Sequence, residues 1–341
     1  LFFIVYFAAR LIAERRFFIY EFLAGLSGVV LAFVLWWAPT IIEHGFKLLE
    51  SCCICPRKCG VNRLKDEKGF CKTGIKPGVC SYMPHHGEEP PISGTHGSGT
   101  IFFSYCNMAC VYCQNYEFSQ LGQGREVDSE ELAKSMLELE KMGCHNINLV
   151  TPTHVMPQIL KALELAINKG LKIPLVYNTG GYELPEIIKL LDGIVDIYLP
   201  DMRYADKALA LRYSKAEDYP EYNRKAVKEM QRQVGVAEID AEGIIKRGLI
   251  IRHLVLPNNI SGTDKIMKFI SEEISKDTYI SLMSQYCPYY KASQFKEISR
   301  RITSQEYEEA KQSMNKHGLY NGWIQESYGS ERFAGIHIKP I

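Results

Sequence analysis

The sequence has no excess of charge of either sign, no internal repeat and no low-complexity tract. Its 40 Lys and Arg residues and 39 Asp and Glu residues give a formal net charge of +1, which argues against nucleic acid as a partner. With 46% hydrophobic and 23% charged residues, the composition excludes an intrinsically disordered chain and a collagen-like fibre. A chain of 341 residues can bury a large core, so it does not need disulfide bonds to fold.

Cysteine is the unusual residue type, because it is concentrated in one segment. There are 11 cysteines, and nine of them lie between Cys52 and Cys113. An odd number of cysteines confined to one part of a large chain is not typical of a secreted disulfide framework. The pattern favours thiolates that bind metal.

One run, residues 22–42, contains no charged side chain. As a helix it would be about 31 Å long, close to the hydrocarbon thickness of a bilayer. Trp36 and Trp37 lie near one end of the run, where interfacial aromatic residues are common. The sequence predicts an apolar N-terminal helix, which would attach the protein to a membrane if it spans the bilayer. The alternative is a hydrophobic helix that packs on the rest of the protein.

The chain divides into three predicted parts. Residues 1–48 are the apolar leader, residues 49–98 are a cysteine-rich metal-binding element with little helical or strand periodicity, and residues 99–341 are an α/β core. In the core, short apolar runs alternate with amphipathic helical patterns, which predicts a parallel sheet with right-handed crossovers. The predicted strands are 100–104, 147–150, 173–177, 195–199, 249–256 and 279–283.

The clearest predicted helix begins after Asp128, with Glu131 completing a capping pair. Gly143 and Gly170 are placed where helices should end. Periodicity does not show whether the sheet closes into a barrel. The other predicted helices are 159–167, 184–191, 222–234, 266–274 and 305–317.

The first predicted core strand is followed at once by Cys106, Cys110 and Cys113 in the spacing C-x3-C-x2-C. The carboxyl ends of parallel strands are where α/β proteins place their ligand sites. Four thiolates would complete the ligands of a [4Fe–4S] cluster, whereas three leave one iron with an open coordination position, as in catalytic zinc sites. The spacing therefore predicts a reactive iron–sulfur cluster. A structural zinc site or one edge of a ferredoxin cluster is the alternative.

With Tyr112 before the last cysteine, this motif resembles the C-x3-C-x-aromatic-C signature of the radical S-adenosylmethionine (SAM) superfamily. Further segments are similar to the pyruvate formate-lyase activating enzyme homologues of that superfamily. The resemblance covers roughly residues 50–290. Its segments are 52–63 with Cys71, 87–94, 97–104 and 113–117.

The resemblance implies a partial (βα)6 TIM-like barrel in which the three cysteines of the motif hold a [4Fe–4S] cluster. The open iron would bind SAM, and one electron would cleave SAM to methionine and a 5′-deoxyadenosyl radical for hydrogen abstraction. The implied partners are a low-potential electron donor of the flavodoxin or ferredoxin type and a protein substrate such as a glycyl radical enzyme. Because a reduced cluster is oxygen-sensitive, we expect a cytoplasmic catalytic domain. The alternative function is an iron–sulfur electron-transfer or metal-binding scaffold module without its own substrate.

A second cysteine group lies upstream and consists of Cys52, Cys55, Cys59 and Cys71. Four thiolates suit a closed site, either an auxiliary iron–sulfur cluster or a structural zinc. The spacing does not distinguish these metals, and Cys53 could take the place of Cys52. Reduced free thiols in a loop are the third interpretation.

Polar residues at the ends of predicted strands are the candidates for binding SAM. Where activating enzymes carry Gly-Gly-Glu, this chain has Thr151 and Thr153, so a hydroxyl or carbonyl of either would receive the SAM amino group. Arg252 resembles a family arginine near the SAM carboxylate. A helix cap or a loop hydrogen bond is the alternative at each position. The full candidate set is Tyr112, Thr151, Thr153, Asn178, Asp201 and Arg252.

Overall fold

The computed structural model describes residues 41–325, and the structural statements below concern that part of the chain. The predicted apolar helix at 22–42 therefore lies outside the described residues, apart from its last two positions. Residues 41–47 are helical, and Ile41 packs into the core. Within 41–325, no helix is both long enough and apolar enough to cross a bilayer.

The core is a mostly parallel sheet with the strand order β10-β9-β8-β6-β5-β4-β2-β1-β3. All six predicted strands are present, which confirms the α/β fold. Because the order ends at β3 and β10, the described sheet is open, as in a partial barrel. The parallel strands are β2 (Ser98–Phe103), β4 (Ile147–Val150), β5 (Leu175–Thr179), β6 (Ile197–Pro200), β8 (Ile245–Leu254), β9 (Tyr279–Met283) and β10 (Gly322–Ile324).

Three short or peripheral strands complete the sheet in antiparallel fashion. β1 (Gly78–His85) pairs with β2 and with β3 (Arg125–Glu126), while β7 (Glu238–Ile239) pairs with β8. β1 lies in the cysteine-rich element and is not predicted from the sequence. Its first four residues are all buried, so it lacks the alternation of apolar and polar residues that identifies a half-buried strand.

Helices connect successive parallel strands, and their ends follow local capping chemistry. The α6 N-terminus is a capping box, in which Asp128 accepts a hydrogen bond from the backbone N–H of Glu131 at 2.8 Å and the Glu131 side chain accepts one in return. Gly143 and Gly170 have positive φ after α6 and α7, as the sequence predicts. The helices are α4 (Pro90–Ser93), α5 (Tyr116–Ser119), α6 (Ser129–Lys141), α7 (Met156–Asn168), α8 (Pro185–Lys189), α9 (Lys207–Ser214), α10 (Tyr219–Val234), α11 (Thr263–Phe269) and α12 (Ser304–Lys316).

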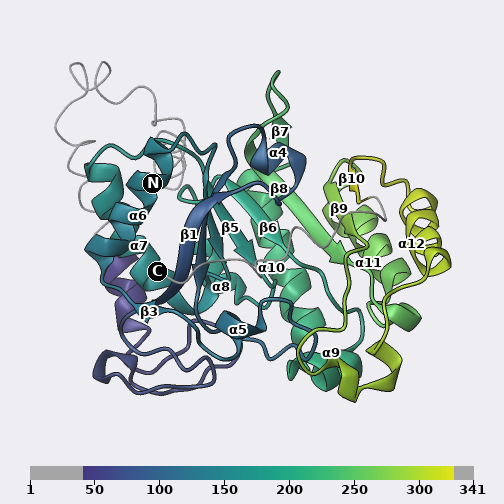
Figure 1. Cartoon of the computed structure of the whole chain (residues 1–341), viewed down its shortest axis with the longest axis horizontal. Helices are drawn as coiled ribbons and strands as arrows, with labels where there is room; N and C mark the ends of the chain where they lie inside the picture. The colour runs from purple at the N-terminus through teal and green to yellow at the C-terminus, as the bar shows by residue number, and fades with distance from the viewer. Residues whose placement is uncertain (1–40, 326–341) are drawn as a thin grey trace, which may run out of the picture.

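The two faces of the sheet bury different side chains, because successive strand residues point to opposite sides. Leu175 and Tyr177 of β5 pack in the large core that includes Leu163 of α7. Val176, between them, packs instead with Ile92 of α4. Figure 1 shows α6 and α7 at one end of the sheet, α11 and α12 at the other, and α4 beside β8. α4 covers only part of the sheet face to which Val176 belongs. A pocket lies on the same face of the sheet, where Asn178 of β5 lines it.

Candidate active site

A pocket opens at the carboxyl ends of the parallel strands, and residues from β2, β4, β5, β6, β8 and β9 or the loops after them line it. The structure brings together here residues that lie as far apart in sequence as Cys106 and Arg252. Thr153 is the one candidate of the cluster and SAM set that does not line the pocket. The predicted residues that do are Cys106, Cys110, Tyr112, Cys113, Thr151, Asn178, Asp201 and Arg252.

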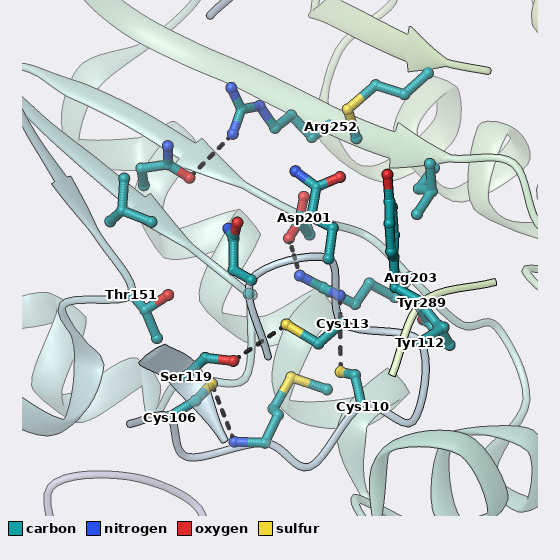
Figure 2. Close-up of a pocket in the computed structure, with 18 of the residues that line it drawn as sticks. Cys106, Cys110, Tyr112, Cys113, Ser119, Thr151, Asp201, Arg203, Arg252 and Tyr289 are labelled. Atoms are coloured by element: carbon teal, nitrogen blue, oxygen red, sulfur yellow. Dashed lines mark hydrogen bonds and ion pairs between the residues drawn. The ribbon is translucent and has the colours of Figure 1, made fainter. Parts of the chain in front are cut away.

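The three cysteines of the motif lie in a loop, residues 106–113, that we call the cluster loop. Figure 2 shows their sulfur atoms directed into the pocket. The Cys106 sulfur accepts a backbone N–H within the loop at 3.3 Å. Ser119 Oγ lies 3.1 Å from the Cys113 sulfur, and Ser214 Oγ donates to the Cys110 sulfur at 3.0 Å. Sequence reasoning missed both serines, since nothing in the local pattern separates them from ordinary helix residues.

Burial and repulsion from neighbouring sulfur atoms make the Cys106 and Cys113 thiols poor acids when no metal is bound. Burial, together with the neighbouring Cys110 sulfur, raises the pKa of Cys106 to about 12 and that of Cys113 to about 11. Arg203 acts in the opposite direction. Three thiols that are buried or half-buried and face one space need a shared cation to ionise together, because charge in a low-dielectric site must be compensated. This donor set fits an iron–sulfur cluster.

Arg203 is the positive charge beside the cluster loop. Its Nη1 lies 3.7 Å from the Cys110 sulfur, and its Nη2 donates to Asp201 Oδ2 at 2.5 Å. Its backbone N–H donates to the Tyr219 hydroxyl at 3.0 Å. Its Nε is buried with no hydrogen-bond partner among the described residues. Arg203 is therefore fixed by Asp201 and Tyr219, with donor capacity left over at the pocket.

The pocket wall contains a strained threonine. Thr151 follows β4 with φ at +61°, an unusual conformation for a β-branched residue. Its backbone N–H donates to the carbonyl oxygen of Asn178 at 2.8 Å. Figure 2 shows its side chain at the pocket. Backbone strain of this kind persists where neighbouring structure enforces it, often at functional sites.

Arg252 forms ion pairs with Glu88 and Glu89, which lie in the segment before α4. Its Nε and Nη2 donate to the Glu89 carboxylate at 2.7 and 2.6 Å, and Nη2 also donates to Glu88. Its Nη1 donates to Asn178 Oδ1 at 3.1 Å. Burial alone would raise the pKa of Glu89, but the charge and hydrogen bonds of Arg252 outweigh it and lower that pKa. Arg252 thus holds Glu88, a lining residue, in place; the sequence analysis did not assign either glutamate to the site.

Thr153 faces away from the pocket toward a buried carboxyl group. Its hydroxyl donates to Glu183 Oε1 at 2.5 Å, and the Thr179 hydroxyl donates to the same oxygen. Glu183 is fully buried, and burial raises its pKa to about 7 despite these hydrogen bonds. Thr153 therefore supports a buried acid, in line with the local hydrogen-bond alternative for this position.

The second cysteine group lies in loops away from the pocket, and none of its members lines it. Cys52, Cys55 and Cys71 are buried, whereas Cys59 is half-buried. Buried Arg63 donates to the Gly74 carbonyl oxygen at 3.2 and 3.0 Å and lies 4.0 Å from the Cys52 sulfur. Across residues 41–325, no three Cys, His, Asp or Glu side chains are arranged as ligands of a single metal ion. Metal binding by this group remains a prediction.

Residues 100–237 match the family model described as the radical SAM superfamily. The uncharacterized protein MJ0674 of Methanocaldococcus jannaschii is 33% identical over 291 residues, which is 82% of this chain and 78% of that protein. A structure of TYW1 with a lysine-pyruvate adduct bound matches 65% of this chain and 74% of its own, at 12% identity and a TM-score of 0.43. Streptococcus suis SuiB bound to the precursor peptide SuiA matches 66% and 47%, at 11% identity and a TM-score of 0.46.

Proposed function

The chain belongs to the radical SAM superfamily, whose members cleave SAM at an iron–sulfur cluster, and from this premise we propose that it is an enzyme that abstracts a hydrogen atom from a substrate bound in the pocket. The observation that carries the proposal is the set of three sulfur atoms directed into one pocket at the strand ends. Cys106, Cys110 and Cys113 would hold a [4Fe–4S] cluster. When bound, the cluster supplies the electron that splits SAM into methionine and a 5′-deoxyadenosyl radical.

The residues around the cluster loop have separate tasks in this proposal. Arg203 offsets the charge of the Cys110 thiolate, since cation and sulfur are 3.7 Å apart. Tyr112 anchors the loop, because its hydroxyl lies 2.6 Å from that of Tyr204 in the buried core. Both contacts fix the loop before any ligand enters, which is the preorganisation that a reactive site requires.

The pocket wall supplies acceptors for the polar parts of SAM. Thr151, Asn178 and Asp201 lie on the lining and offer oxygen atoms. Four of the five N–H groups of Arg252 already donate to Glu88, Glu89 or Asn178, so one N–H, on Nη1, is left for a SAM carboxylate. We propose that Arg252 holds Glu88 and Asn178, which line the pocket, in place. The contacts of Thr153 do not support a role in SAM binding.

The resemblance of the flanking segments favours a glycyl radical enzyme as the substrate, with a flavodoxin or ferredoxin as the electron donor. The catalytic domain would then work in the cytoplasm, where low-potential donors are available. Incubation with pyruvate formate-lyase as the trial substrate tests this finer proposal. Activation should produce the electron paramagnetic resonance doublet of a glycyl radical, and its absence with an active enzyme would exclude that partner.

The experiment that tests the proposal is anaerobic reconstitution with iron and sulfide, followed by SAM and dithionite. We expect a [4Fe–4S] absorption and resonance signature and the release of 5′-deoxyadenosine and methionine in equal amounts. Metal analysis of the same sample counts iron and zinc per chain and so tests the second cysteine group. Cluster-loaded protein that releases no 5′-deoxyadenosine would instead support the electron-transfer or scaffold function.

A further inference from the structure

Arg57, which lies between Cys55 and Cys59 in the sequence, joins the cysteine-rich element to the cluster loop. Arg57 Nε donates to the carbonyl oxygen of Asn107 at 2.9 Å, across 50 positions of the chain. Its Nη1 donates to the carbonyl oxygen of Lys215, across 158 positions. One guanidinium therefore joins three segments that are far apart in sequence.

The two carbonyl groups that accept from Arg57 belong to Asn107 and to Lys215. Asn107 is within the cluster loop, and its buried side chain donates to the Tyr182 carbonyl oxygen at 2.7 Å. Lys215 directly follows Ser214, the residue whose hydroxyl donates to the Cys110 sulfur. The Ser214 carbonyl also accepts the backbone N–H of Ala109 at 3.2 Å. Movement of either carbonyl would change the environment of a cluster-loop thiol.

Two aromatic rings flank the guanidinium. Its central carbon lies 3.8 Å from the centre of the Phe70 ring and 5.1 Å from that of Tyr182. Phe70 is 37% exposed, so it covers the guanidinium from solvent, and its backbone N–H lies 3.4 Å from the Cys59 sulfur. A planar cation between rings with two directed hydrogen bonds is an arrangement that lysine cannot reproduce.

We propose that Arg57 is a positioning residue for the cluster loop, through which the order of the cysteine-rich element fixes the backbone beside Cys106 and Cys110. The proposal rests on the proposed function in assigning a cluster to that loop. The coupling itself is a property of the metal-free chain. Loss of order around Cys55 and Cys59 would loosen the cluster loop, although the two cysteine groups lie apart.

The test is amide hydrogen exchange in the metal-free protein, comparing Arg57→Lys with wild type. The informative amides are those of Ala109 and Val111, which donate to the carbonyl oxygens of Ser214 and Tyr213 at 3.2 and 2.9 Å. We expect their exchange to accelerate about tenfold, the effect of losing one or two hydrogen bonds. Lys58→Ala, at the exposed next residue, is the matched control and should leave both amides unchanged.

A second readout follows the cluster itself. After reconstitution, Arg57→Lys should bind about half the iron of wild type or less, and its reduced cluster should give a broadened resonance signal. Phe70→Leu, which removes the cover and keeps the arginine, should give a smaller change of the same kind. Exchange at Ala109 and Val111 within twofold of wild type would overturn the proposal, and so would acceleration that extends equally to α6. Failure of the proposed function, by contrast, would leave the exchange result intact and appear only as missing 5′-deoxyadenosine from the wild type.

Discussion

The two cysteine groups consist of the same side chain, but they differ in their surroundings. The cluster loop, 106–113, follows a buried parallel strand and faces a pocket. The upstream group, from Cys52 to Cys71, lies in loops around a short 3-10 turn, and none of its four cysteines lines that pocket. A cluster that must admit SAM needs an open side, whereas a site that only joins loops does not. From this difference in position we infer a reactive cluster at the cluster loop and propose a closed site for the upstream group.

An arginine also lies near each group, Arg203 at the cluster loop and Arg63 at the upstream group. The two arginines differ in whether they reach the pocket and in how far they are exposed. Arg203 reaches the Cys110 sulfur from the pocket, and its side chain is 23% exposed. Arg63 is 1% exposed, and its Nε and Nη2 donate to the Gly74 carbonyl oxygen. Arg203 is partly exposed and can respond to a ligand in the pocket, whereas buried Arg63 holds its own loop. Substitutions in the two regions should therefore have different consequences.

The largest expected effect is at the cluster loop. Cys110→Ala should reduce 5′-deoxyadenosine formation to background, since it removes one of three cluster ligands. Product analysis by mass spectrometry after anaerobic reconstitution measures this. Cys144→Ala, at a buried cysteine of the core, is the matched control and should retain product. Turnover by the Cys110 variant would refute its assignment as a ligand.

Glu183 lies between the two regions and should give the next largest effect, on stability. Burial raises its pKa to about 7 from 4.5. A group with a raised folded-state pKa contributes stability that is present below the unfolded pKa and lost as pH rises through the folded value. The metal-free protein should therefore lose about 3 kcal/mol at this residue between pH 4.5 and 7.

Urea unfolding of wild type and Glu183→Gln at pH 5, 6, 7 and 8 measures this loss, because the glutamine stays neutral throughout. The difference between the two unfolding free energies should shift in favour of the variant as pH rises. Glu186→Gln, at the exposed glutamate three residues later, should show no such shift. Parallel pH profiles for wild type and Glu183→Gln would contradict the raised pKa.

Arg63→Gln tests the structural interpretation of the upstream group. The substitution leaves the Gly74 carbonyl without its two hydrogen bonds, which should lower the free energy of unfolding by about 2 kcal/mol. The rate of 5′-deoxyadenosine formation per intact cluster should stay within about twofold of wild type, since Arg63 is remote from the pocket. Thermal unfolding and single-turnover assays on one preparation measure both quantities. A large loss of rate at unchanged stability would reverse the contrast between the two groups.

Elements with strong local signals could be predicted from the sequence. β4 and β9 have the predicted bounds, because β4 is buried throughout and β9 is buried after its first residue. The capping pair of Asp128 and Glu131 located the start of α6, since both partners lie within one turn. Such features need only neighbouring residues, so a single sequence contains them in full.

Contacts between distant segments could not be predicted in the same way. Glu89 meets Arg252 across 163 positions, and Ser214 meets Cys110 across 104. No local periodicity marks these partners, because the fold creates each contact by bringing loops together. Thr153 illustrates the same limit. Its position after a strand predicted that it lines the pocket, but its hydroxyl donates to Glu183, which does not line the pocket.

Arg203→Gln should give the smallest effect, about a tenfold lower rate of 5′-deoxyadenosine formation. The substitution removes a cation 3.7 Å from the Cys110 sulfur, but partial exposure of Arg203 weakens that interaction through solvent screening. It also leaves Asp201 without its ion-pair partner. The double variant Arg203→Gln, Asp201→Asn separates these causes, because it removes the unpaired carboxylate as well. Recovery in the double variant would assign the loss to Asp201, whereas an equal or greater loss would assign it to the charge beside Cys110. If the single variant stays within twofold of wild type, 5′-deoxyadenosine formation does not depend on the arginine beside the cluster loop, just as it is not expected to depend on Arg63.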